Sequence, residues 1–202
     1  MINTACNKCY CLNHLTITSP VLIANEIYRL LPFDQSHPLA LNRIMPVIDL
    51  AHSLNWLDES QYKESSMASV DMLARYHDID YVEAVLLAEN NRCVPVKLGK
   101  RYNLGRHGNS YFSKIFTRPA TTAGASILAG QLLADNEEGI IFSLAGGNHH
   151  AKKNQASGFC IFNDPVLGIL SMLDNGLKKI LYVDLDAHHG DGVQEAFQHD
   201  DR

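Results

Sequence analysis

The sequence predicts an α/β fold with three layers, in which helices cover both faces of a parallel sheet. Two short apolar segments, residues 139–145 and 179–186, are rich in β-branched and aromatic residues. Each ends in glycines or polar residues, as buried strands do. Segments with helical periodicity lie between the strand candidates, and this alternation is typical of a parallel sheet covered by helices.

The other elements are predicted from shorter patterns. Weaker strand candidates cover residues 21–27 and 72–73. Apolar residues at helical spacing predict helices over residues 42–54, 80–88, 119–133, 164–175 and 192–199. Asp164 and Pro165 suit a helix start, since Asp caps helices and Pro is favoured in the first turn. Residues 93–116 are long and irregular, and such loops in compact α/β domains tend to be functional.

We expect residues 1–18 to be a loose tail and residues 19–202 to be the N-terminal part of a single domain. The tail holds Cys6, Cys9 and Cys11. Their spacing is too short for a usual zinc knuckle, so we interpret them as reduced thiols. The sequence stops directly after a predicted helix, where this architecture expects another strand, so the domain looks truncated before its end.

Composition limits the classes of function. Apolar residues make up 46% and charged residues 19%, as in soluble globular proteins. The net charge of -5 and the scattered basic residues disfavour nucleic-acid binding. No apolar run is long enough to cross a bilayer, and the N-terminus lacks the features of a signal peptide. We therefore expect a cytoplasmic protein with neither a nucleic-acid nor a membrane partner; its oligomeric state is open.

Two carboxylates and an imidazole lie at the carboxyl end of the second strand candidate. In an extended chain, Asp184, Asp186 and His188 point to the same side. Ligands bind at the carboxyl ends of parallel strands, and carboxylate oxygen and imidazole nitrogen both suit Zn²⁺. The alternative is a solvated acidic turn that caps the next helix, but the abrupt change from apolar strand to this pattern favours a metal site.

Two adjacent histidines, His149 and His150, follow the first strand candidate and should reach the same edge of the sheet. Alone, such a pair is more often a surface feature. Beside a metal-ligand pattern it becomes a candidate general acid and base. Further along, Gly158 next to Phe159 could form a narrow aromatic wall for a substrate stem, or it could simply be a turn with core packing.

These motifs closely resemble the zinc-dependent histone deacetylase family, which includes bacterial deacetylase-like proteins and acetylpolyamine amidohydrolases. The matching segments are residues 145–153, 156–164 and 182–194, with His37, Pro38 and Arg43 upstream in the expected order. The resemblance covers about residues 19–202. It implies the three-layer α/β/α fold of the arginase/deacetylase superfamily.

The resemblance also implies metal sites. Asp186 and His188 would be two ligands of a catalytic zinc ion. Asp184, with the backbone carbonyls of Asp186 and His188, would help to hold a potassium ion. An arginase-like pair of manganese ions is a rival, but its second metal would need a carboxylate at the position of Gly190.

The same resemblance implies a proton-transfer pair. His149 and His150 would be the tandem histidines of the family, with His150 as the general base. Asp184 would orient His149, and Asp191 would orient His150.

A substrate channel is implied as well. Phe159, next to Gly158, would line the channel for the acylated side chain, and Arg43 would lie near its inner end. Many relatives carry an Asp in the loop over residues 103–116 that grips the substrate backbone. Here the sequence has Arg106, His107, Gly108 and Asn109 instead.

The implied activity is zinc-dependent hydrolysis that removes acetyl groups from acetyl-lysine, acetylpolyamines or similar small acyl amides. The family's third zinc ligand and its carbonyl-polarising tyrosine have no counterpart in these 202 residues. The alternative is therefore a catalytically inactive fragment or a binding module of the same fold.

Overall fold

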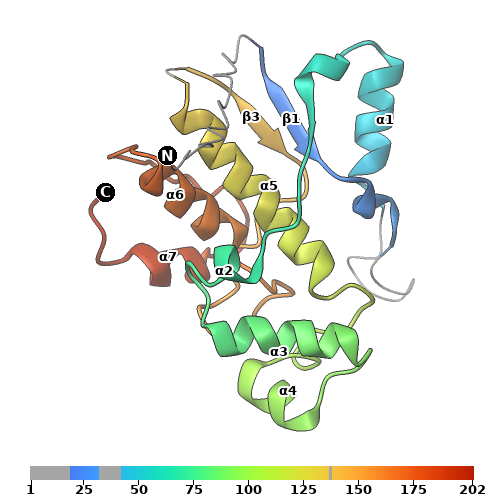
Figure 1. Cartoon of the computed structure of the whole chain (residues 1–202), viewed down its shortest axis with the longest axis vertical. Helices are drawn as coiled ribbons and strands as arrows, with labels where there is room; N and C mark the ends of the chain where they lie inside the picture. Colours follow the sequence, from blue (N-terminus) through green and yellow to red (C-terminus); the bar gives the residue numbers. More distant parts are fainter. Residues whose placement is uncertain (1–18, 32–41, 137) are drawn as a thin grey trace, which may run out of the picture.

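A parallel sheet with helices on both faces organises the chain (Figure 1). The computed structural model describes residues 19–31, 42–136 and 138–202. Its strands are β1 (Val21–Ala24), β2 (Tyr62–Glu64) and β3 (Ile141–Ser143), in the order β2-β1-β3. Both pairings are parallel, and Leu22 of β1 lies opposite Tyr62 on one side and Phe142 on the other.

The helices of the described residues follow in chain order. They are α1 (Met45–Ser53), α2 (Val70–Leu73), α3 (Ile79–Asn90), α4 (Val96–Tyr102), α5 (Thr117–Ala134), α6 (Asp164–Asp174) and α7 (Asp191–Phe197), with two short 3-10 helices, η1 (Glu26–Arg29) and η2 (Glu59–Gln61). None of them is both long and apolar enough to cross a membrane.

Alternate residues of β1 face the two helical layers. Val21 and Ile23 are buried in a cluster with Ala125 of α5. Ala24, one position on, is buried in a second cluster with Met45 and Ile48 of α1. Because successive side chains of a strand point to opposite faces, α5 and α1 cover opposite faces of the sheet. The fold is therefore the three-layer α/β/α architecture that the sequence predicts.

A third cluster of buried residues is centred on aromatic rings. Phe162 contacts Tyr81 of α3 and Phe116, with ring centroids 6.1 and 5.7 Å apart. The hydroxyl of Tyr81 donates a hydrogen bond to the carbonyl of Ile161 at 2.7 Å. This packing holds residues 156–163, which lead into α6, against the rest of the domain.

Most of the predicted elements are present. The predicted strands at 21–27 and 139–145 are confirmed as the shorter β1 and β3, and all five predicted helices are confirmed within a few residues as α1, α3, α5, α6 and α7. Pattern reading missed β2 and α4. The strand expected at Met72 and Leu73 is wrong: these residues lie in α2, because the side chain of Ser69 caps that helix by accepting a hydrogen bond from the Met72 amide.

The second strong strand candidate is also wrong as a paired strand. Residues 179–186 are not assigned to any strand. Leu181, Val183 and Leu185 are 88%, 63% and 92% exposed. A strand needs a neighbour to accept its backbone hydrogen bonds, and within the described part of the chain no strand pairs with this segment. Within the segment, the amide of Ile180 alone donates to a distant backbone group, the carbonyl of Arg202 at 2.8 Å.

Two sequence interpretations fall outside the described residues. One concerns the tail over residues 1–18, with Cys6, Cys9 and Cys11. The other concerns the upstream His37, which belongs to residues 32–41. Of the remaining cysteines, Cys93 is an exposed thiol and Cys160 a buried one, and neither forms a disulfide.

Candidate functional site

A buried carboxylate anchors the loop that follows β3. Asp164, the first residue of α6, accepts hydrogen bonds from the backbone amides of Gly147 and Asn148, from the Asn148 side chain and from the hydroxyl of Ser126 on α5. Burial raises the pKa of the Asp164 carboxyl, although these donors act against that shift. The helix cap expected at Asp164 is instead Asn163, whose side chain accepts from the Val166 amide.

His149 lies in this loop, and its side chain is almost fully buried. Its Nδ1 is 2.7 Å from Oδ2 of Asp184. The same carboxylate accepts hydrogen bonds from the hydroxyl of Tyr182 and from the amide of Asp186. The bond from His149, above all, lowers the pKa of the Asp184 carboxyl to about 2. Asp184 is therefore ionised at neutral pH and acts as an acceptor, so Nδ1 of His149 carries a proton.

His150 forms the same kind of pair with a second carboxylate. Its Nδ1 is 2.7 Å from Oδ1 of Asp191, the first residue of α7. Burial opposes the ionisation of Asp191, but hydrogen bonds from Lys152 and His150 lower the pKa of its carboxyl to about 2. Nδ1 of His150 thus donates to Asp191, which leaves Nε2 of this imidazole able to accept a proton.

The two imidazoles lie side by side and near the second motif. The ring centroids of His149 and His150 are 4.2 Å apart, and those of His150 and His188 are 6.0 Å apart. Gly158 makes this arrangement possible, since a Cβ atom at that position would collide with the ring of His150. Its φ of +53° also favours glycine.

Asp186 and His188 lie on the exposed turn before α7. Oδ1 of Asp186 accepts from the amide of His188 at 2.7 Å and lies 2.9 Å from its Nδ1. The bond from the His188 amide, together with that from its ring, lowers the pKa of the Asp186 carboxyl. The two side chains are 52% and 77% exposed.

The donor atoms at this turn fit part of a zinc site. Oδ1 of Asp186 and Nδ1 of His188 converge, and carboxylate oxygen with imidazole nitrogen is a usual ligand pair for zinc. A catalytic zinc ion takes three protein ligands, and the described ranges contain no cluster of three His, Cys, Asp or Glu side chains able to hold a metal. Asp186 and His188 would therefore account for two of the three ligands of such a site.

The residues expected to line a substrate channel come together as well. Phe159 has a φ of +67° and remains 43% exposed. It lines a cavity of about 150 Å³ that Arg43 and Asn148 also line. The cavity therefore reaches from Arg43 to the residue next to His149.

The loop that lacks the expected Asp contacts Phe159 instead. Asn109 is buried, and its side-chain oxygen accepts a hydrogen bond of 2.8 Å from the amide of Phe159. The position of Gly108 lies so close to the Phe159 ring that a Cβ atom there would be 2.7 Å from it. Sequence reasoning placed no role on Asn109, because its partner lies 50 positions away.

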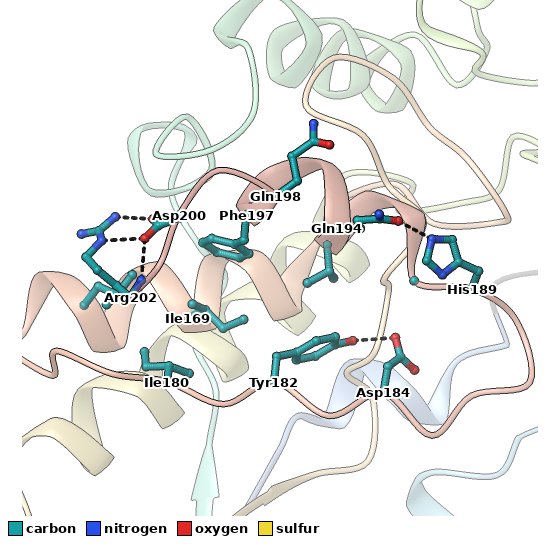
Figure 2. Close-up of a pocket in the computed structure, with 13 residues that line it drawn as sticks. Ile169, Ile180, Tyr182, Asp184, His189, Gln194, Phe197, Gln198, Asp200 and Arg202 are labelled. Atoms are coloured by element: carbon teal, nitrogen blue, oxygen red, sulfur yellow. Dashed lines mark hydrogen bonds and ion pairs between the residues drawn. The ribbon is translucent and has the colours of Figure 1, made fainter.

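A second cavity, of about 410 Å³, lies between α6, α7 and residues 180–184 (Figure 2). Ile180, Tyr182 and Asp184 line it, so these alternate residues face the helices. Figure 2 shows the Tyr182 hydroxyl bonded to the Asp184 carboxylate, and both residues line this cavity. The cavity thus borders the carboxylate that orients His149.

Sequence reasoning also missed the residues that hold the histidine loop from behind. The ring of His77 is buried; its Nδ1 lies 3.0 Å from the carbonyl oxygen of Lys152, and its Nε2 accepts from the amide of Asn163 at 3.0 Å. The side chain of Asn163 in turn donates to the carbonyls of His149 and Ala151. Asn163 belongs to the matching segment 156–164, but nothing in the spacing of that segment shows what Asn163 contacts.

Known proteins resemble this chain in both sequence and structure. The histone deacetylase domain matches residues 37–202. The acetoin utilization protein AcuC of Bacillus subtilis (strain 168) is 32% identical over 177 residues, which cover 88% of this chain and 46% of that protein. Histone deacetylase 9 of Arabidopsis thaliana is 39% identical over 174 residues, 84% of this chain and 40% of that protein.

Two solved structures have the same fold. A homolog of histone deacetylases in complex with SAHA superimposes with a TM-score of 0.83 at 35% identity and covers 92% of this chain and 49% of its own. A homolog from Aquifex aeolicus gives a TM-score of 0.81 at 36% identity, over 88% of this chain and 47% of its own. The chain spans about half the length of these relatives. On the extent of the domain match, the chain belongs to the histone deacetylase family.

Proposed function

We propose that the protein removes acetyl groups from acetyl-lysine or related acetylated amines by zinc-dependent hydrolysis. The observation that carries this proposal is the pair of His–Asp hydrogen bonds beside the Asp186–His188 turn. Similarity to proteins named as histone deacetylases, and to a homolog in complex with SAHA, supports the same class of reaction.

His150 would act as the proton acceptor. Because its Nδ1 donates to Asp191, its Nε2 is free to take a proton from the water that attacks the acetyl carbonyl carbon. The carbon–nitrogen bond of the amide then breaks, and an imidazole of the pair returns a proton to the leaving nitrogen. The products are acetate and a free amine. His149, whose Nδ1 donates to ionised Asp184, would be the second imidazole of this proton-transfer pair.

Asp186 and His188 would hold the zinc ion, and the proposal requires a third ligand from a part of the protein other than the described residues. A zinc ion supplies Lewis acidity: it polarises a carbonyl and lowers the pKa of water. Asp184, with the carbonyls of Asp186 and His188, would also contribute to a potassium site.

The substrate would be a neutral acyl amide on a slender stem. Gly158 and Phe159 would form one wall of its channel, with the Phe159 backbone held by Asn109. Arg43 would lie at the inner end of the same cavity. Acetylated protein lysine, acetylpolyamines and similar small acyl amides all have the required shape.

Metal content and turnover test this proposal. The protein expressed from its complete coding sequence should bind about one zinc ion per chain, as a single catalytic site requires. It should release acetate from an acetyl-lysine peptide or from N-acetylputrescine, and a chelator should stop the reaction. Asp186→Asn should lose both zinc and turnover, while Asp201→Asn, on an exposed carboxylate, should lose neither. Turnover that survives complete removal of metal would contradict the proposal.

A second candidate function, recognition of an acylated chain without turnover, is favoured by the exposure of Asp186 and His188. The same experiment separates the two. Saturable binding of the acetyl-lysine peptide by a zinc-loaded protein that releases no acetate would favour the binding module.

A further inference from the structure

We propose that Lys152 is a positioning residue for His150. It holds the Asp191 carboxylate in the orientation in which that carboxylate accepts the hydrogen bond of the imidazole. The inference rests on the proposed role of His150 as proton acceptor, but its structural part can be tested without turnover.

Asp191 divides its two oxygens between two partners. Oδ1 is 2.7 Å from Nδ1 of His150, and Oδ2 is 2.7 Å from the ammonium nitrogen of Lys152. The side chain of Lys152 is only 16% exposed. Because a half-buried ion pair is less screened than a surface pair, Lys152 fixes the rotation of the carboxylate, and with it the position of Oδ1.

Lys152 also connects the loop that carries His150 to helix α7. Its ammonium group lies 3.1 Å from Oε2 of Glu195, one helical turn after Asp191 on α7. Without the lysine, these two carboxylates would repel each other at a spacing of four residues. The ammonium group therefore fixes the first turn of α7 as well as the side chain of Asp191.

The backbone of Lys152 is itself firmly held. Its amide donates to the carbonyl of Gln155 at 3.0 Å, and its carbonyl oxygen is 3.0 Å from Nδ1 of the buried His77. A lysine stem is flexible, so a fixed backbone limits the positions that its ammonium group can reach. The connection runs from His77 through Lys152 and Asp191 to the ring of His150.

The other histidine is held without a lysine. The carboxylate of Asp184 accepts from His149, Tyr182 and the amide of Asp186, and over the described residues it forms no ion pair with Lys or Arg. Lys152 thus acts on one histidine of the pair. The next residue, Lys153, provides a matched control, since its side chain is 62% exposed and points toward Asp78, 3.8 Å away.

The test compares Lys152→Met, Lys152→Arg and Lys153→Met in the protein expressed from its complete coding sequence. Lys152→Met should lower kcat roughly 10–100-fold, the usual effect of removing a residue that orients a site histidine, with KM and zinc content unchanged. Lys152→Arg should restore most of the rate, and Lys153→Met should match the wild type. The Nδ1 proton resonance of His150 in ¹H NMR should shift or broaden in Lys152→Met, while that of His149 stays in place.

Unchanged kcat together with an unchanged His150 resonance in Lys152→Met would overturn the inference. Equal loss of both histidine resonances in a Lys152→Met protein that remains folded would also overturn it, because Lys152 would then not act on His150 in particular. If the wild type itself shows no turnover, the proposed function fails, and the NMR comparison alone decides the role of Lys152. If Lys152→Met does not fold, Lys152→Gln with Glu195→Gln, which removes the like-charge pair, should still lose the His150 resonance relative to Glu195→Gln alone.

Discussion

The histidine cluster and the Asp184–His188 turn belong to the same candidate site but are held in different ways. His149 and His150 lie on a loop fixed from behind by Asp164, Asn163 and His77, all of which are buried. Asp186 and His188, by contrast, are more than half exposed and bonded mainly to each other. The difference teaches that contacts among the described residues position the candidate proton-transfer pair, whereas the same residues give the candidate metal-ligand turn few contacts beyond its own.

The largest expected effect concerns His150, the proposed general base. His150→Ala should lower kcat by about 100–10,000-fold, the range for a lost general acid–base group. Zinc content should stay at the wild-type value, because the ligand turn does not depend on this imidazole. His199→Ala, on an exposed histidine after α7, serves as the control. Loss of zinc in His150→Ala would show that the two clusters are not separate.

The next effect concerns the buried anchor. Asp164→Ala should lower the free energy of unfolding by about 3–5 kcal/mol, since it leaves the Ser126 hydroxyl and the amides of Gly147 and Asn148 without their acceptor. Urea denaturation measures this change. Asp201→Ala, at an exposed position, should change stability by no more than about 0.5 kcal/mol. Equal effects at the two positions would contradict the anchoring role of Asp164.

A third effect is a pH dependence of stability caused by His77. Burial lowers the pKa of this imidazole to about 4, so between about pH 4 and 6.5 the unfolded chain binds the proton more readily than the folded one. Stability should therefore be highest above pH 6.5 and fall by up to about 3 kcal/mol as pH drops to 4. His77→Gln should flatten this part of the urea-denaturation profile.

The pairs at Asp184 and Asp191 act in a different pH window. Both carboxyls have a folded pKa of about 2, below the ordinary value of 3.8. Their contribution to the free energy of unfolding is present above pH 3.8 and is lost as pH falls toward 2.

The His77 prediction has a clear contradicting outcome. A stability profile of His77→Gln that keeps its full slope between pH 4 and 6.5 would show that a group other than His77 causes the pH dependence.

The smallest effect is a difference in amide exchange. In the 202-residue chain, the amides of residues 181–185 should exchange nearly as fast as in an unfolded peptide, since that segment has no strand partner. The amides of Asn163 and Gly192, bonded to His77 and to the carbonyl of His149, should exchange far more slowly. Hydrogen–deuterium exchange with residue resolution would measure this, and equal protection of the two regions would contradict the comparison.

The sequence by itself determined the fold class, most helices, two of the strands and the family. Periodicity and turn residues are local, and motifs such as 145–153 and 182–194 are long enough to identify the family without coordinates. The same motifs pointed to the candidate site residues His149, His150, Asp184, Asp186, His188 and Asp191.

Only the tertiary structure decided how these residues are held. The partners of Asn109, His77 and Asp164 lie between 16 and 86 positions away, so no local pattern reports them. Residues 179–186 have the composition of a strand, but pairing depends on a neighbouring segment, and the structure leaves them extended and exposed. Local sequence sets the preferred conformation of a segment, while hydrogen bonds and ion pairs between distant segments decide which side chains meet.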